Sequence, residues 1–125
     1  MATKAILKLT QVHGVVKVRG TGSATIALAT DLKKTSETQS SPKANIRTLH
    51  WALSVGSTAT ITRNSVVLYY LSGSGKMEFM GWSDNEENGS DIVVDFTGGQ
   101  GAVVLELAKV SGYGSQQHQN QGDLG

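Results

Sequence analysis

The sequence predicts a single all-β domain, a β-sandwich or jelly-roll-like arrangement of about eight antiparallel strands, and three observations support this. Short runs of alternating apolar and polar residues recur along the chain, with the period of half-buried strands. Glycine, serine and asparagine, which are common in turns, separate these runs. No segment sustains the 3.6-residue period of an amphipathic helix. Many short strands with short connections favour a sandwich or jelly roll.

The N-terminal part of the chain predicts three strands. We expect the first strand to end near His13 and Gly14, and a turn at residues 20–23, where glycine recurs. The residues expected on the buried faces of these strands are, in order, Ala5, Leu7 and Leu9; Val16 and Val18; and Ile26 and Leu28.

Residues 31–45 have a different composition. They are rich in Lys, Thr, Ser and Gln, contain the single proline, Pro42, and have no apolar residue between Leu32 and Ala44. Polar connections of this length in a compact domain are usually functional. We therefore expect a long surface loop that serves as an interaction arm within a domain of residues 1–113.

Strands resume after this loop, with turns expected at Gly56-Ser57, at Arg63-Asn64 and at residues 72–75 and 98–101. Residues 66–71 are apolar on both faces, so we place them in a central strand. In the last strand, Glu106 and Lys109 are expected to point outward. The residues expected to point inward are Leu49, Trp51, Leu53, Ala59, Ile61, Met77, Phe79, Ile92, Val94, Phe96, Val103, Leu105 and Leu107.

Composition narrows the classes of function. The formal net charge is +1, from 11 basic and 10 acidic residues, so no footprint for nucleic acid is expected. Only 17% of residues are charged and none is cysteine, which excludes disulfides and thiol chemistry. No run is apolar enough for a signal peptide or a membrane span, so we expect synthesis in a cytoplasm and no membrane partner. The Gly/Gln-rich tail, residues 114–125, is expected to be flexible unless a partner orders it.

Several stretches imitate known sites without completing them. Gly73-Ser74-Gly75-Lys76 ends like a phosphate-binding loop, but Met77 follows the lysine where Ser or Thr is required. Residues 84–95 offer oxygen ligands at calcium-loop spacing, yet the flanking runs read as strands; a solvated hairpin loop is favoured and cation binding stays open. His13, His50 and His118 show no ligand spacing. We therefore predict no catalytic, cofactor-binding or metal-binding residues.

The aromatic residues allow two interpretations. Large aromatics usually fill the core of a small β domain, but they also stack on sugars or anchor protein contacts. Tyr70 and Trp82 are out of phase with their inward-pointing neighbours. These two side chains are our candidates for an exposed contact patch.

Four stretches of the chain, residues 25–32, 61–66, 89–95 and 105–113, resemble a group of small structural proteins in the virions of tailed bacteriophages, of the T4-like and marine phage type. The resemblance covers most of residues 3–113 and consists of strand and turn patterns. It does not include the polar loop or the tail. It implies a non-enzymatic virion protein present in many symmetric copies or as a homo-oligomer, on the capsid surface or in the neck or tail.

Within that class a capsid decoration (cement) protein that binds the major capsid protein is the first expectation. The alternatives are a ring component of the phage neck, tail or baseplate, and a carbohydrate-binding β-sandwich module. Flexible segments that become ordered on binding lose entropy, which many symmetric copies offset through avidity. The residues expected to contact a partner are Lys33, Lys34, Arg47, Tyr70, Trp82, Gln116, Gln117, Gln119 and Gln121.

Overall fold

A computed structural model shows an all-β protein and describes residues 2–10, 12–32, 42–78, 84 and 86–111. Seven antiparallel strands and one helical turn lie within these residues. The elements are β1 (Thr3–Leu9), β2 (His13–Ile26), α1 (Leu28–Asp31), β3 (Lys43–Leu53), β4 (Thr58–Arg63), β5 (Val66–Ser72), β6 (Ser74–Glu78) and β7 (Ile92–Ser111). The predicted sandwich of antiparallel strands is confirmed.

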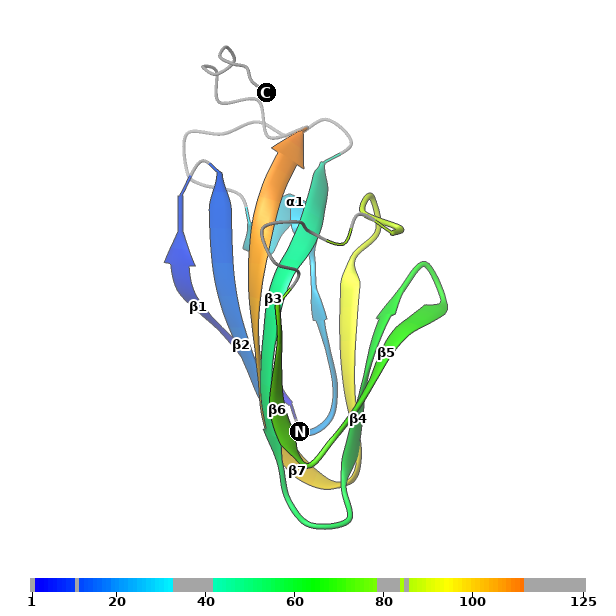
Figure 1. Cartoon of the computed structure of the whole chain (residues 1–125). Coiled ribbons are helices and arrows are strands. Elements are labelled where there is room, and N and C mark those ends of the chain that lie inside the picture. Colours follow the sequence, from blue (N-terminus) through cyan, green and yellow to red (C-terminus); the bar gives the residue numbers. More distant parts are fainter. Residues whose placement is uncertain (1, 11, 33–41, 79–83, 85, 112–125) are drawn as a thin grey trace.

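Two long strands, β2 and β7, run through both layers of the molecule (Figure 1). In the first layer, residues 13–20 of β2 and 101–111 of β7 pair with each other, between β1 on one side and β3 and β6 on the other. In the second layer, residues 22–26 of β2 pair with residues 92–97 of β7, followed by β4 and then β5. The two layers are therefore one sheet folded across the middle of its two longest strands.

Glycine makes this fold possible, and it forms two of the predicted turns. Residues 20–23 and 98–101 reverse the chain from one layer to the other, as predicted, and β2 and β7 pair with each other on both sides of the reversal (Figure 1). Gly20, Gly22 and Gly98 have φ of 118°, 77° and 82°, values that side chains with a Cβ rarely adopt. A Cβ on Gly101, which pairs with Gly20, would lie 2.2 Å from a Leu53 methyl carbon. The bend thus needs both the backbone freedom and the small size of glycine.

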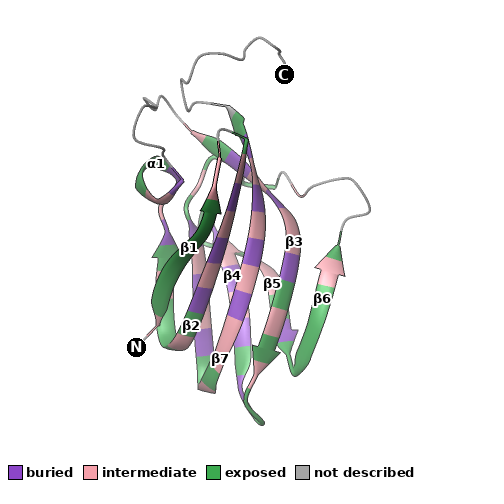
Figure 2. Cartoon of the chain, turned by 90° about the vertical axis from the view of Figure 1, so that its left-hand side faces the viewer, coloured by how far each residue is buried: buried purple, intermediate pink, exposed green. Residues whose placement is uncertain are grey.

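The core fills the space between the two layers. Figure 2 shows buried and half-buried residues alternating along β2, β7 and β3 of the first layer. Most of the predicted inward positions are confirmed as buried, since period-two patterns fix which face is covered. The buried apolar residues are Val16, Val18, Ile26, Leu28, Leu32, Ala44, Ile46, Leu49, Ala59, Ile61, Leu71, Ile92, Val94, Phe96, Val103, Leu105 and Leu107.

The two outermost positions of the sheet contradict the sequence prediction. Residues 66–71 were expected at the centre, but β5 pairs only with β4 among the described residues and is an edge strand. The first strand, β1, was expected to be half buried, but it is exposed until Leu9, and Leu7 is 56% accessible. An apolar run does not reveal whether its neighbours come from the same chain.

Smaller differences follow from local geometry. Leu28 lies in the helical turn α1 and still reaches the core. Asp31 ends that turn and β3 begins at Lys43, so ordered elements extend into both ends of the expected polar loop. Lys109 was expected to point outward but is 8% accessible, because it continues the inward phase of Leu105 and Leu107. Its ammonium donates to the Thr10 carbonyl at 2.9 Å. No helix in the described ranges is long and apolar enough to cross a membrane.

Candidate functional site

The outer face of the second layer carries almost no charge. Its outward side chains come from three registered rows that cross the paired strands. Asp95 is the one charged residue among them, and we call this set the threonine face. Its members are Ser23, Thr25, Thr58, Thr60, Thr62, Val67, Tyr70, Ser72, Val93, Asp95 and Thr97.

The outer face of the first layer is the opposite in character, and we call it the charged face. One row across it joins Lys17, Val104, His50 and Lys76 on four neighbouring strands. Five cations (Lys8, Lys17, Arg19, Arg47 and Lys76) and two carboxylates (Glu78 and Glu106) lie on this face. The two sides of the molecule therefore present different surfaces to a partner. Protein interfaces are depleted of charge at their centres and enriched in tyrosine, which favours the threonine face for docking.

The edge strand β5 borders the threonine face and is itself apolar. Its sequence, Val-Val-Leu-Tyr-Tyr-Leu-Ser, contains no charge, glycine or proline. Val66 and Val67 are each 40% accessible and Tyr70 is 81% accessible. Exposed large apolar side chains on an uncharged edge strand are typical of an interaction site.

The other edge strands carry features that discourage pairing with a second chain. The strand β1 contains Lys4 and Lys8 and has an irregular register between Ile6 and Lys8. The strand β6 has five residues, among them Lys76 and Glu78, which form an ion pair at 3.3 Å. Charges, bulges and shortness are the devices by which natural sheets protect their edges. Of the edge strands β1, β5 and β6, only β5 lacks charge; the fourth described edge, residues 22–26 of β2, is also uncharged but exposes no large apolar side chain.

A buried arginine holds the β4–β5 hairpin in place. Arg63 is 1% accessible at the end of β4, where Asn64 and Ser65 form the turn with φ of 51° and 62°. Its guanidinium donates to the Ala44 carbonyl at 2.7 Å and the Asn88 carbonyl at 3.0 Å. It also donates twice to the Ser90 carbonyl, at 3.0 and 2.7 Å. One side chain thus ties the hairpin to β3 and to residues 88–90.

A second contact fixes the inner side of β5. The Tyr69 hydroxyl donates to Asp84, whose backbone pairs in both directions with Ile46 of β3. Burial, followed by the hydrogen bond and charge of Asp84, raises the pKa of Tyr69 well above its usual range. The hydroxyl therefore stays protonated and donating at physiological pH, so the outward neighbour Tyr70 stands on a fixed strand.

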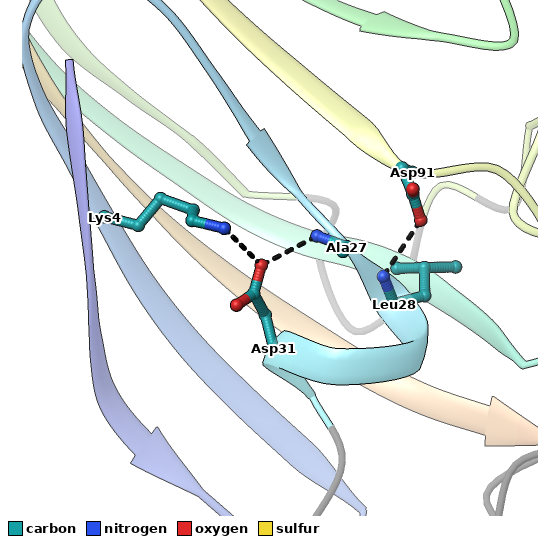
Figure 3. A network of polar contacts seen from close by, with 5 residues as sticks. All are labelled: Lys4, Ala27, Leu28, Asp31 and Asp91. Carbon is teal, nitrogen blue, oxygen red and sulfur yellow. Dashed lines mark hydrogen bonds and ion pairs between the residues drawn. The ribbon is translucent and has the colours of Figure 1, made fainter. Parts of the chain in front are cut away.

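Carboxylates also anchor the helical turn at the opposite edge of the second layer (Figure 3). Asp31 accepts hydrogen bonds from the Lys4 ammonium at 2.6 Å and from the Ala27 amide at 2.8 Å. Asp91 accepts from the Leu28 amide at 2.9 Å. These contacts join β1, α1 and the start of β7.

Only part of the predicted contact set falls within the described residues. Tyr70 is exposed on the threonine face, as expected, and its role as a contact residue stays a prediction. Arg47 is half buried on the charged face, where its guanidinium lies 2.8 Å from Nε2 of His13. The structure does not bring these two side chains to one surface. The others, Lys33, Lys34, Trp82, Gln116, Gln117, Gln119 and Gln121, lie outside the described residues.

The loop with calcium-like spacing uses its described side chains for protein contacts. Glu87 accepts from the Asn64 amide group at 2.9 Å, and Asn88 donates to Asn45 at 2.9 Å. Among described residues, no group of three His, Cys, Asp or Glu side chains is placed to hold a metal ion. His13 lies on the charged face, where burial and then the Arg47 charge lower its pKa.

The aromatic residues in the described part do not gather on one surface. Phe96 is buried and Tyr69 packs against the core. Trp51 packs against the core, beside Gly75, and donates to the Ser72 carbonyl at 3.0 Å. Tyr70 is the aromatic residue of the threonine face. This arrangement supplies an anchor for a protein contact more readily than a stacking platform for sugars.

Sequence reasoning missed the residues that hold the surface in place. Arg63 continues the alternation of Ala59 and Ile61, so its phase indicates burial, although its charge argues against it. Glycine content identified the two turns between the layers, but not that β2 and β7 pair with each other on both sides of them. The exposure of Val66 and Val67 depends on sheet order, for which the chain carries no local signal.

Comparison with known proteins adds one structural similarity. No protein-family model matches the sequence, and no curated protein matches it significantly. Among solved structures, a cupin superfamily protein from Desulfitobacterium hafniense DCB-2 aligns with a TM-score of 0.40 and 8% sequence identity. The alignment covers 89% of this chain and 79% of that one. No conclusion about family or function is drawn from a similarity at this level.

Proposed function

We propose that this chain is a non-enzymatic structural protein of a tailed-bacteriophage virion, and specifically a decoration protein that docks on the major capsid protein. The class comes from the resemblance in strand and turn patterns. The observation that supports docking is the threonine face, an almost uncharged surface bordered by the exposed apolar strand β5.

The chemistry of the threonine face suits contact with protein. Threonine and serine hydroxyls both donate and accept hydrogen bonds, and burying them avoids the large desolvation cost of a charge. Tyr70 supplies an amphipathic anchor at the border of the face. The charged face on the other layer stays hydrated and keeps the particle surface soluble. A decoration protein requires this division, because one side meets the capsid and the other meets water.

Location in the particle is the decisive test. Quantitative mass spectrometry of purified particles gives the copy number, and cryo-EM gives the position. Copies distributed over the head lattice support the decoration role. A small symmetric ring at the neck, tail or baseplate transfers the protein to the alternative virion class. Absence from particles refutes both.

Charge substitutions identify the docking side. We expect Thr60→Glu to weaken binding to particles that lack the protein, because it places a carboxylate on the threonine face. His50→Glu makes the same change on the charged face and serves as the matched control. Equal loss in both variants contradicts docking through the threonine face. Binding to a glycan array, together with absence from particles, supports the carbohydrate-binding alternative instead.

A further inference from the structure

We infer that β5 is the self-association edge of this protein: two copies pair their β5 strands antiparallel about a two-fold axis. This inference rests on the proposed structural function and names one partner of its surface, a second copy of the same chain. The β5 edge faces away from β4 and is apolar on both sides, as the centre of a sheet usually is. Pairing with the β5 strand of another copy places β5 at the centre of a larger sheet.

Charge selects β5 over β1 and β6, and exposure selects it over residues 22–26 of β2, which are uncharged but expose no large apolar side chain. Two-fold antiparallel pairing sets each residue opposite its mirror position in the partner strand. On β1 such pairing centred on Ile6 sets Lys4 against Lys8 of the other copy, which is repulsive. The strand β6 offers only five residues. All seven residues of β5 are uncharged, so every register of self-pairing is free of repulsion between like charges.

Exposure on β5 points in the same direction. Val66, Val67 and Tyr70 are three of the eight large apolar side chains that the described surface exposes. Strand addition covers these side chains and satisfies the outward backbone groups of the edge. The buried Arg63 and the contact between Tyr69 and Asp84 fix the strand before the partner arrives, which limits the entropy lost on association.

The geometry also places the two docking surfaces together. A two-fold axis perpendicular to the sheet keeps both outer faces on the same side. The second layers of two copies then form one continuous sheet, with β5 and its symmetry mate at the middle, and the two threonine faces join into one surface. The charged faces remain on the other side of the dimer.

Sedimentation velocity of the full chain across a wide concentration range tests the association. We expect the mass to rise from one chain to two and then to stop, because the dimer uses both β5 edges. The double variant Val67→Lys and Tyr70→Lys should raise the dimer dissociation constant by about tenfold or more, since it opposes like charges across the new pair. The control, Val55→Lys with Val110→Lys, adds the same charge at exposed positions outside β5. Thermal unfolding followed by circular dichroism verifies that both variants fold.

Disulfide trapping locates the contact, because the chain has no cysteine of its own. Single cysteines placed in turn at the β5 positions 66 to 72 should give a cross-linked dimer under oxidation at the position on the two-fold axis, where a residue opposes its own copy within disulfide reach. Val55→Cys should not. A chain that stays monomeric at all concentrations overturns the inference, as does cross-linking through Leu7→Cys on β1 in place of β5. Particle location is read separately, so a monomer found in virions overturns only the pairing, and a dimer absent from virions overturns only the virion role.

Discussion

Replacing Arg63 by methionine should destabilise this protein more than the same replacement of an exposed lysine or arginine. The guanidinium is buried and makes four hydrogen bonds to three carbonyl groups, at 2.7 to 3.0 Å. Methionine fills most of the same volume but donates nothing. The variant therefore removes the donors and leaves the acceptors in place.

The magnitude follows from which carbonyls lose their partner. Asn88 also accepts from the Ala44 amide at 3.0 Å, so it keeps one hydrogen bond. Ser90 loses two and Ala44 loses one. A buried acceptor left without a donor costs about 1–3 kcal/mol, and removal of the desolvated charge returns part of this. We expect a net loss of about 2–4 kcal/mol, a large share of the roughly 5–15 kcal/mol by which a domain is stable.

Urea unfolding followed by circular dichroism measures this loss directly. In thermal unfolding, at about 4 °C per kcal/mol, the same loss should lower Tm by about 8–16 °C. Arg63→Lys should lie between methionine and the parent, because an ammonium keeps the charge but cannot reach three carbonyls with a planar fork. Arg19→Met, at an exposed position, should stay within about 0.5 kcal/mol of the parent. A loss under about 1 kcal/mol for Arg63→Met would refute the idea that the guanidinium holds the hairpin to β3.

Three further substitutions test the bend, the helical turn and the pH response. Gly98→Ala should lower the free energy of unfolding in urea by about 1–3 kcal/mol, since φ is 82° and the new Cβ lies 2.9 Å from a backbone oxygen. In the control, Gly89→Ala, the new Cβ meets nothing closer than 4.0 Å, so this variant should be nearly as stable as the parent. Asp31→Ala should cost about 1–2 kcal/mol by freeing the Ala27 amide, and Lys4→Ala under about 1 kcal/mol, because it removes only a partly exposed ion pair; equal losses would contradict this. Burial, with nearby positive charge, lowers the pKa of His13 below its usual 6.5. As the pH drops below about 6.5, the unfolded chain takes up this proton more readily than the folded chain, so the free energy of unfolding falls until the pH passes the lower folded pKa. His13→Gln should flatten that part of the stability–pH curve, and an unchanged slope would show that another group dominates.

Period-two patterning identifies the inward side of most strands correctly. Val16, Leu49, Ile61, Ile92 and Leu105 are all buried where alternation places them. The same phase also applies to Arg63 and Lys109, which the structure buries with the apolar residues. Sequence reasoning failed on Lys109 because it ranked chemical type above phase, and it assigned Arg63 to a turn that the structure forms from Asn64 and Ser65. A long side chain can point inward at such a position when backbone carbonyls lie within reach of the donors at its tip.

The glycine-rich segments 20–23 and 98–101 were predicted correctly as turns, but the pairing of the strands around them was not predicted. A hairpin turn, and a turn at which two paired strands pass together from one layer to the other, both need positive φ, so the local sequence is the same for each. What separates them at Gly20 and Gly101 is pairing, since these residues face each other in neighbouring strands. Pairing between residues about eighty positions apart is not visible in a single sequence. The contact residues of the predicted loop and tail lie outside the described residues, so their roles stay predictions.

An apolar edge strand in a protein with protected neighbouring edges needs an explanation. If the exposure of β5 were only a defect, association through it would be unspecific, and raising the concentration would produce species of growing size. Two-fold pairing behaves differently, because each copy uses its exposed apolar edge and the dimer then presents β1 and β6, which carry charges, and residues 22–26 of β2, which expose no large apolar side chain. Association starts at β5 and stops at the dimer, because both β5 edges are then paired. The distribution of masses at high concentration therefore separates a built interface from an aggregation-prone edge, even before the partner strand is located.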